Sequence, residues 1–170
     1  MNTRKPRSPM RRRLVLASAT WVVAGVSAAA TVTAMGPSGG TGGAVFDCVA
    51  PTGAAPKITE VRVRFGRYVD SIQVLYSDGR AGVVHGGSGG QLQTLRLDAD
   101  ETIQQISGKY GSQVDSIQIR TSKGKVLSAG GSGGNAAFSY AAPPGLSISD
   151  FSGRSGQYLD AVGACIASLK

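Results

Sequence analysis

The sequence is poor in residues that bind metal ions. It contains one histidine, His85, and two cysteines, Cys48 and Cys165, which stand far apart in the chain. Structural zinc sites use closely spaced pairs of such residues, so no metal site is expected. In an exported protein, two distant cysteines predict a disulfide that joins the two ends of a domain, and two separate buried thiols are the alternative.

The N-terminal segment lacks acidic residues. Residues 1–13 (MNTRKPRSPMRRR) contain six basic side chains, and an apolar stretch rich in alanine and valine follows at 14–36. The small residues VTA at 32–34 suit a cleavage site, so residues 1–34 are predicted to be a secretory signal peptide and residues 35–170 the exported domain. Cleavage would give a secreted protein with no membrane insertion. The alternative is an uncleaved membrane anchor, because the stretch approaches the roughly 20 residues that a bilayer requires.

The predicted domain carries little excess charge. The whole chain has 18 Lys+Arg and 10 Asp+Glu. Six of the basic residues and none of the acidic ones lie in residues 1–34, which leaves 12 against 10, a net charge of +2. Binding of nucleic acid requires a clustered basic face, so nucleic acid is not an expected partner.

The sequence after residue 36 shows no helical periodicity, but it repeats itself. The segments YVDSIQVLYSDGR (68–80), QVDSIQIRTSKGK (113–125) and YLDAVGACIASLK (158–170) align at a constant spacing of 45 residues. Apolar and polar residues alternate, for example in ITEVRVRF (58–65), and this alternation is typical of half-buried strands. Three copies with about four strands each predict an all-β domain of three similar sheets around a common core.

Two motifs recur in step with this repeat. A Gly-x-x-x-Asp turn stands at 66–70, 111–115 and 156–160, and a glycine-rich segment stands at 39–43 (GGTGG), 86–90 (GGSGG) and 130–134 (GGSGG). An ionised carboxylate accepts several hydrogen bonds, and glycine lets backbone N–H groups approach a bound molecule closely. The combination favours a ligand with adjacent hydroxyl groups. Aspartates that merely cap turns and glycines that form flexible linkers are the alternatives.

Catalytic functions are not expected. A glycosidase needs two carboxylates at roughly 5–10 Å, whereas each turn offers one aspartate. The acidic segment LDADE (97–101) is interpreted as a solvated turn and His85 as a structural residue at a strand end. The segment GGSGG lacks the following Lys-Ser/Thr of a phosphate-binding loop.

These motifs, in their order along residues 36–168, resemble the jacalin-related lectins, in particular members with three sugar sites. The resemblance implies a β-prism of three four-stranded Greek-key sheets with pseudo-threefold symmetry, no enzymatic activity and no cofactor. It also implies that each aspartate binds hydroxyl groups of a mannose or glucose ring, together with amides of its turn and the last glycine of one loop. The implied sites are Asp160 with Gln157, Tyr158 and Gly43; Asp70 with Arg67, Tyr68 and Gly90; and Asp115 with Ser112, Gln113 and Gly134.

The same resemblance also has implications for the preferred sugar and for the oligomeric state. Gln113 stands where the other turns have Tyr68 and Tyr158, so the site at Asp115 is expected to be the weakest. Galactose-preferring relatives depend on a chain cut beside the site, which nothing at 39–43 marks, so glycans that contain mannose or glucose are the expected partners and galactose is the alternative. Relatives dimerise in different ways, and a homodimer is one assembly that the resemblance allows. A β-prism that has lost sugar binding and serves as an interaction or structural module is the competing function.

Overall fold

The computed structural model describes residues 1–2, 31–50 and 55–168, and these residues form twelve strands and no helix. The strands are β1 (Thr33–Gly39), β2 (Ala44–Phe46), β3 (Ile58–Phe65), β4 (Val69–Tyr76), β5 (His85–Gly86), β6 (Gln91–Arg96), β7 (Ile103–Tyr110), β8 (Val114–Thr121), β9 (Val126–Gly130), β10 (Ala136–Ala141), β11 (Ser147–Ser155) and β12 (Leu159–Ala167). The predicted signal peptide falls almost entirely on residues 3–30, outside the described residues, and β1 begins at Thr33, just before its predicted end.

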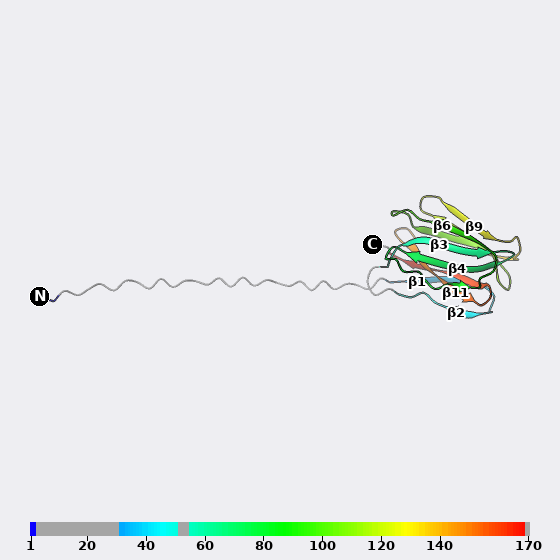
Figure 1. The fold of residues 1–170 in the computed structure, drawn as a ribbon, viewed down its shortest axis with the longest axis horizontal. Coiled ribbons are helices and arrows are strands. Elements are labelled where there is room, and N and C mark those ends of the chain that lie inside the picture. Colours follow the sequence, from blue (N-terminus) through cyan, green and yellow to red (C-terminus); the bar gives the residue numbers. More distant parts are fainter. Residues whose placement is uncertain (3–30, 51–54, 169–170) are drawn as a thin grey trace.

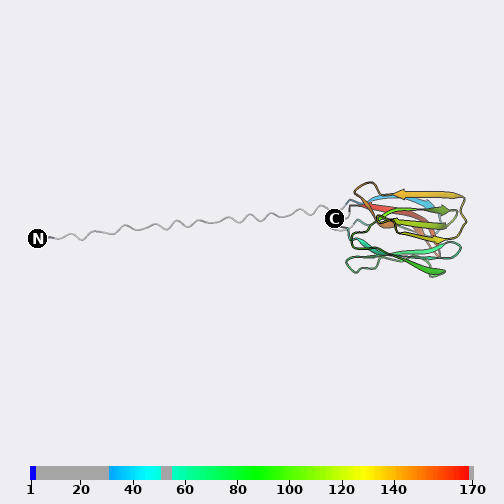
Figure 2. The same ribbon diagram turned by 90° about the horizontal axis from the view of Figure 1, so that it is seen from above.

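Three groups of four strands repeat one spatial order. The first group pairs as β5-β4-β3-β6, the second as β9-β8-β7-β10 and the third as β1-β12-β11-β2. Each group is a Greek key, because its fourth strand returns to lie beside its first. A bridge between Ile148 and Ile103 joins the third group to the second. The expected all-β fold is thus confirmed. Pairing joins the second and third groups into one eight-stranded sheet, whereas the first group is a separate four-stranded sheet, which lies along one side of the domain in Figure 2.

Alternating side chains build one core between the groups. In β3, Val61 and Val63 are fully buried, whereas Arg62 and Arg64 reach the outer face. The next strand of this group and the equivalent strands of the other two groups also bury alternate residues, chiefly Ile72, Val74, Ile106, Ile117, Ile119, Phe151, Leu159, Val162 and Ala164. Apolar burial of this extent supplies the main driving force for folding, about 25 cal/mol per Å² removed from water.

The third group combines the two ends of the domain (Figure 1). β1 pairs with β12, and β2 pairs with β11, although β1 and β2 come from the start of the domain and the other two from its end. Cys48, which follows β2, is bonded to Cys165 in β12, with their Cα atoms 5.5 Å apart. The predicted disulfide is therefore confirmed, and loop 39–43 belongs to the same sheet as Asp160.

A β-bulge recurs in each group, at the end of the strand that precedes the Gly-x-x-x-Asp turn. The register shifts between Arg64 and Phe65 in β3, between Lys109 and Tyr110 in β7, and between Arg154 and Ser155 in β11. A bulge bends its strand and increases the local twist. Because the three bulges directly precede the Gly-x-x-x-Asp turns, all three turns leave their sheets in the same way.

β5 is the shortest strand of the first group. The segment AGVVHG (81–86) contributes only His85–Gly86 to a strand, and Val83 and Val84 are exposed. Gly82 still donates its N–H to Val74, but the chain then leaves the edge of β4 and returns only at His85, whose ring stacks on Phe46 at 3.8 Å. The run has no alternation of apolar and polar residues that would hold it to the sheet.

The acidic segment 97–101 is a turn, but it is not wholly solvated. Asp98 and Asp100 are exposed, whereas Glu101 is buried. Its carboxylate accepts hydrogen bonds from Lys125 Nζ (2.7 Å), from the Thr121 hydroxyl and from the N–H of Asp98 (3.0 Å). The interpretation as a solvated turn was wrong for Glu101, because basic and hydroxyl groups of the β8–β9 hairpin compensate its burial.

Candidate functional site

The three Gly-x-x-x-Asp turns share one backbone geometry. In each, the N–H of the first glycine donates to the carbonyl of the residue two positions further on; these bonds are Gly66 to Tyr68 (2.9 Å), Gly111 to Gln113 (2.9 Å) and Gly156 to Tyr158 (3.0 Å). The aspartate that ends the turn is then the second residue of the next strand, and only 7% of Asp70, 6% of Asp115 and 7% of Asp160 is exposed. Carboxylates held at this depth require polar neighbours.

Each aspartate anchors one glycine-rich loop through its own backbone. The N–H of the loop's second glycine donates to the aspartate carbonyl; these bonds are Gly40 to Asp160 (2.8 Å), Gly87 to Asp70 (3.0 Å) and Gly131 to Asp115 (2.8 Å). Three loops that are distant in sequence from one another are thus held in the same way. The structure brings each predicted aspartate together with its predicted loop.

The last glycine of each loop faces the aspartate carboxylate. A Cβ atom on Gly43 would lie 2.5 Å from Asp160 Oδ2, one on Gly90 would lie 2.6 Å from Asp70 Oδ2, and one on Gly134 would lie 3.0 Å from Asp115 Oδ2. The three glycines also have positive φ angles of 62°, 63° and 82°. A side chain here would be strained and would collide with the carboxylate. Each carboxylate therefore faces the bare backbone of a loop glycine, with no side chain between them.

The turn residues differ between the sites. The rings of Tyr68 and Tyr158 meet edge to face, with centroids 5.5 Å apart, so the Asp70 and Asp160 sites adjoin each other. The Arg67 guanidinium lies 5.4 Å from the centroid of the Tyr68 ring. Gln113 occupies the matching position at Asp115 and offers no aromatic surface.

The loops and turns interlock in a ring. The second glycine of each loop packs against the backbone carbonyl of a turn that belongs to a different site; the contacts are Gly40 with Ser112, Gly87 with Gln157 and Gly131 with Arg67. The loop of the Asp160 site therefore touches the turn of the Asp115 site. The loop of the Asp115 site touches the turn of the Asp70 site, and the loop of the Asp70 site touches the turn of the Asp160 site. None of the three contacts leaves space for a Cβ atom. The sites are parts of one continuous surface.

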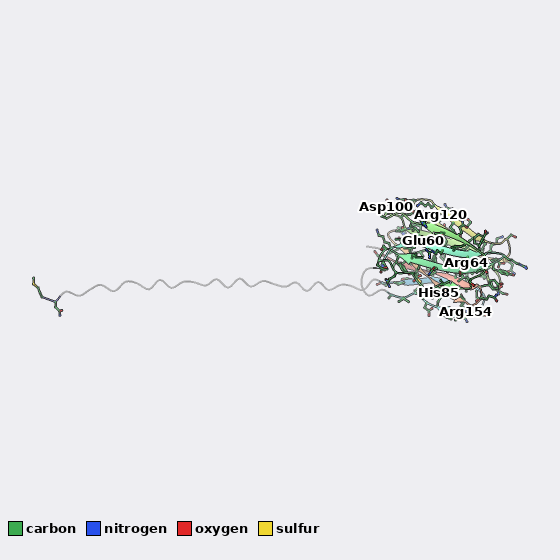
Figure 3. The ribbon with its side chains drawn as sticks, in the orientation of Figure 1. Glu60, Arg64, His85, Asp100, Arg120 and Arg154 are labelled. Atoms are coloured by element: carbon green, nitrogen blue, oxygen red, sulfur yellow. A yellow bond between two sulfur atoms is a disulfide. The ribbon has the colours of Figure 1, made fainter. Side chains whose placement is uncertain are left out.

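Two arginines hold loops from the outer side, and the sequence interpretation missed them. Arg154 donates from Nε and Nη2 to the carbonyls of Gly42 and Gly43, both at 2.8 Å. Arg64 Nη1 donates to the carbonyls of Ser88 (3.1 Å), Gly89 (3.3 Å) and Gly90 (3.2 Å). Figure 3 shows both arginines toward the end of the domain opposite Asp100. The repeat spacing, which aligns Arg64 with Lys109 and Arg154, is the signal that could have found them.

The electrostatics of the Asp160 site balance burial against positive charge. Burial raises the pKa of the Asp160 carboxyl above its ordinary value, while the Arg154 guanidinium and the N–H of Gly156 act in the opposite direction. Arg154 thus favours the ionised carboxylate, which is the form that accepts hydrogen bonds from hydroxyl groups.

A separate cavity of about 590 Å³ lies between the first and third groups. Its lining includes Phe46, Tyr76, His85 and Asp150 but no residue of the three aspartate sites. Burial raises the pKa of Asp150 and lowers that of His85. His85 begins β5 and stacks on Phe46 of β2, so it contributes to packing between two groups, as expected.

Within the described ranges there is no group of three or more histidine, cysteine, aspartate or glutamate side chains that could hold a metal ion. No helix in that part of the chain is long and apolar enough to cross a membrane.

Residues 35–165 match the family of jacalin-like lectin domains. The chain therefore belongs to the jacalin-like lectin family, whose members bind carbohydrate and are not enzymes. No curated protein sequence is significantly similar to it.

Solved structures agree with this assignment. Artocarpin, a lectin with mannose specificity, superposes with a TM-score of 0.69 at 25% identity, over 79% of this chain and 97% of artocarpin. A mannose-binding jacalin-related lectin from Ananas comosus gives a TM-score of 0.69 at 25% identity, over 79% of this chain and 96% of its own. The mannose-binding lectin from champedak, at 24% identity and a TM-score of 0.71, shares the fold over 82% of this chain and 99% of its own.

Proposed function

We propose that this protein is a secreted lectin that binds glycans of the mannose or glucose type non-covalently at up to three sites, centred on Asp160, Asp70 and Asp115. One observation carries the proposal: the same buried carboxylate faces the same two glycines of a loop three times over. A single such turn could be a structural cap. Three copies that all keep bare backbone opposite a carboxylate are better explained by a shared ligand.

The geometry suits adjacent hydroxyl groups of a sugar ring. The carboxylate accepts from two hydroxyls, while the N–H groups of the turn and of the last loop glycine donate to ring or hydroxyl oxygens. Tyr158 and Tyr68 can cover the apolar face of a sugar at the Asp160 and Asp70 sites. We therefore rank the Asp115 site, with Gln113, as the weakest. Mannose is the preferred sugar because artocarpin and the Ananas comosus lectin are mannose-binding relatives.

Single sites of this kind are weak. Each hydrogen bond contributes about 0.5–1.5 kcal/mol net, or about 1.5–3 kcal/mol when one partner is charged. After the cost of association, one monosaccharide binds near the millimolar level, roughly −4 kcal/mol. Contact of one branched glycan with two or three sites raises the apparent affinity by about 10²–10⁴.

Secretion forms a separate part of the proposal. The basic and then apolar segment at 1–34 has the pattern of a signal peptide, and the Cys48–Cys165 disulfide is typical of oxidising compartments outside the cytosol. After cleavage the protein would have no membrane segment and would be free to form a homodimer. N-terminal sequencing of protein recovered from the culture medium tests this. A first residue at or near Met35 supports export with cleavage, and an intact residue 1 on membrane-bound protein contradicts it.

The direct test of the lectin proposal is titration of the exported protein with methyl α-mannoside, followed calorimetrically and through the amide NMR signals of Gly43, Gly90 and Gly134. We expect saturable binding with shifts at the first two glycines and weaker shifts at Gly134. Methyl α-galactoside is the matched control ligand and should bind less tightly. Folded protein that binds neither sugar would overturn the proposal in favour of a β-prism that serves as an interaction module.

Two variants assign the sites. Asp160→Ala should abolish the sugar response of Gly43, and Asp70→Ala should abolish that of Gly90, while each leaves the other response in place. A calorimetric stoichiometry that neither variant changes would show that these aspartates are not the binding groups.

A further inference from the structure

The two arginines described above lie at equivalent places in the repeat. Arg64 stands at the bulge that ends β3 and Arg154 at the bulge that ends β11. Both are half-buried, and both donate to carbonyls of the last residues of a glycine-rich loop rather than to a carboxylate. Neither forms an ion pair with another described residue. The guanidinium hydrogen bonds of both residues therefore go to loop backbone.

The direction of these bonds determines where the loop N–H groups point. A trans peptide unit is planar, and its N–H points away from its C=O; the only cis bond among the described residues is Gly36–Pro37. Arg154 holds the carbonyl of Gly42, which shares a peptide unit with the N–H of Gly43. That N–H therefore points away from the arginine.

The Asp70 site repeats this arrangement. Arg64 holds the carbonyl of Gly89, which shares a peptide unit with the N–H of Gly90, and so directs that N–H away from itself. Three carbonyls of this loop, those of Ser88, Gly89 and Gly90, converge on one guanidinium nitrogen. Glycine has the largest choice of backbone conformations, so a loop with this composition needs an external group to fix its peptide planes.

The third site lacks the arginine. Lys109 occupies the equivalent position at the end of β7, and among the described residues its ammonium group makes no hydrogen bond to loop 130–134. Arginine has a rigid planar fork of donors, whereas lysine has one ammonium on a flexible stem. The carbonyl of Gly133, which would orient the N–H of Gly134, is not held in this way.

We propose that Arg64 and Arg154 are positioning residues of the sugar sites, which hold the carbonyl side of a glycine-rich loop so that the N–H of Gly90 or Gly43 is fixed toward the ligand. This inference rests on the proposed function of those sites. It explains why loops of nearly pure glycine can form binding sites without a large entropic cost on binding. It also divides the protein into two preorganised sites and one, at Asp115, that is less ordered.

The first experiment measures sugar affinity at each site separately, through the amide signals of Gly43, Gly90 and Gly134 in the exported protein. Arg64→Lys should weaken binding of methyl α-mannoside at Gly90 by about tenfold, the change expected from loss of charge-assisted hydrogen bonding. Binding at Gly43 should stay unchanged and serves as the internal control. Arg154→Lys should give the reverse pattern. An affinity at Gly90 within about a factor of two of the wild type in Arg64→Lys would overturn the proposal.

The converse variant introduces the missing contact. Lys109→Arg should strengthen binding at Gly134 several-fold, and should do so also in a Gln113→Tyr background, because the arginine orders the loop and the tyrosine supplies a ring surface. A merely structural role for the arginines predicts no gain at a site where the fold is already intact. Absence of any gain in both backgrounds would contradict the positioning role.

A second readout needs no sugar and separates this proposal from the proposed function. Backbone ¹⁵N relaxation of the sugar-free protein should show Gly89 and Gly90 as rigid in the wild type and as more mobile in Arg64→Lys, with Gly133 and Gly134 mobile in both. If no sugar binds but the loops behave in this way, the lectin function fails while the loop-ordering role stands. Equal mobility of the three loops in the wild type would overturn the loop-ordering role.

Discussion

The phenol rings of Tyr68 and Tyr158 meet edge to face at 5.5 Å, although they come from the turns of two different sites. An edge-to-face pair of this kind contributes about 0.5–1.5 kcal/mol beyond its buried area. Each ring therefore limits the freedom of the other. The Asp70 and Asp160 sites share this contact, and the Asp115 site, with Gln113, stands outside it.

The contact between the Tyr68 and Tyr158 rings predicts that a substitution at one site changes the sugar affinity of the other. Tyr158→Ala should weaken sugar binding at the Asp160 site directly and should also weaken the Asp70 site by up to about 1 kcal/mol, because Tyr68 loses its support. The amide shifts of Gly43 and Gly90 during titration measure the two effects separately. Gln113→Ala is the control and should alter neither. Unchanged affinity at Asp70 in Tyr158→Ala would show that the rings act independently.

The interlocking loops predict a second effect across sites. A Cβ atom on Gly87 would collide with the backbone carbonyl of Gln157, so Gly87→Ala must displace the turn that ends in Asp160. Overpacking of this kind costs about 1–3 kcal/mol, and we expect sugar affinity at Asp160 to fall although Gly87 belongs to the loop of Asp70. Ser88→Ala, in the same loop with an exposed side chain, is the control. A Gly87→Ala variant that loses binding only at Asp70 would contradict the arrangement in which each loop touches the turn of another site.

The disulfide is expected to contribute a large part of the free energy of unfolding. It joins Cys48 to Cys165 across a sequence separation of 117 residues and ties the β1–β2 segment to β12. Replacement of both cysteines by serine should lower the free energy of unfolding by about 2–5 kcal/mol. Urea denaturation measures the loss, and wild-type protein in the presence of a reductant should match the variant. If the double serine variant and the reduced wild-type protein both unfold at the midpoint of the oxidised wild type, the pairing of β1 with β12 is sufficient to hold the two ends of the domain together.

The buried Glu101 predicts a pH dependence of stability. Burial alone would raise its pKa, but hydrogen bonds from Lys125, Thr121 and the N–H of Asp98 outweigh burial and lower the pKa to about 2. Because the pKa in the folded state lies below the ordinary 4.5, the stabilising contribution is complete above pH 4.5 and is lost as the pH falls toward 2.

Glu101→Gln should therefore cost about 1–3 kcal/mol of unfolding free energy at pH 7 and much less near pH 2. Urea titrations at several pH values test this. Asp100→Asn, which removes an exposed ion pair with Lys123, should change stability by less than about 1 kcal/mol. A penalty for Glu101→Gln that is the same at both pH values would mean that shape, and not charge, determines its role.

The sequence permitted prediction of the strands and of three equivalent aspartate turns because both follow from a regular spacing. The repeat of 45 residues places Asp70, Asp115 and Asp160 at equivalent points, and alternation identifies the buried residues of β3 and β4. The resemblance supplied the match between each aspartate and its loop, including loop 39–43, which reaches Asp160 only because β1 pairs with β12.

Other features depend on contacts that no local pattern reveals. An arginine on the outward face of a strand has the appearance of a solvated residue, so Arg64 and Arg154 could not be distinguished from Arg62 by alternation. Glu101 lies among acidic neighbours, and only the fold brings Lys125 to it. The ring of loops and turns requires three sheets to meet at one end, which is a property of the tertiary structure.

The raised pKa of Asp160 predicts that its site responds to acid. Burial raises the pKa above the ordinary 3.8 and Arg154 opposes the rise, so the carboxylate gains a proton at a higher pH than a free aspartate does. A protonated carboxyl accepts fewer hydrogen bonds from sugar hydroxyls. The affinity measured at Gly43 should therefore fall as the pH is lowered through a value above 3.8.

Arg154→Met should move the midpoint of this decline to higher pH, because the charge that favours the ionised form is removed. Asp160→Asn should bind weakly and with no pH dependence over the same range, which separates titration of this group from acid unfolding. Titrations with methyl α-mannoside from pH 7 downward, followed at Gly43, give the midpoints. A midpoint that Arg154→Met leaves in place would mean that Arg154 acts on the loop alone and not on the charge of Asp160.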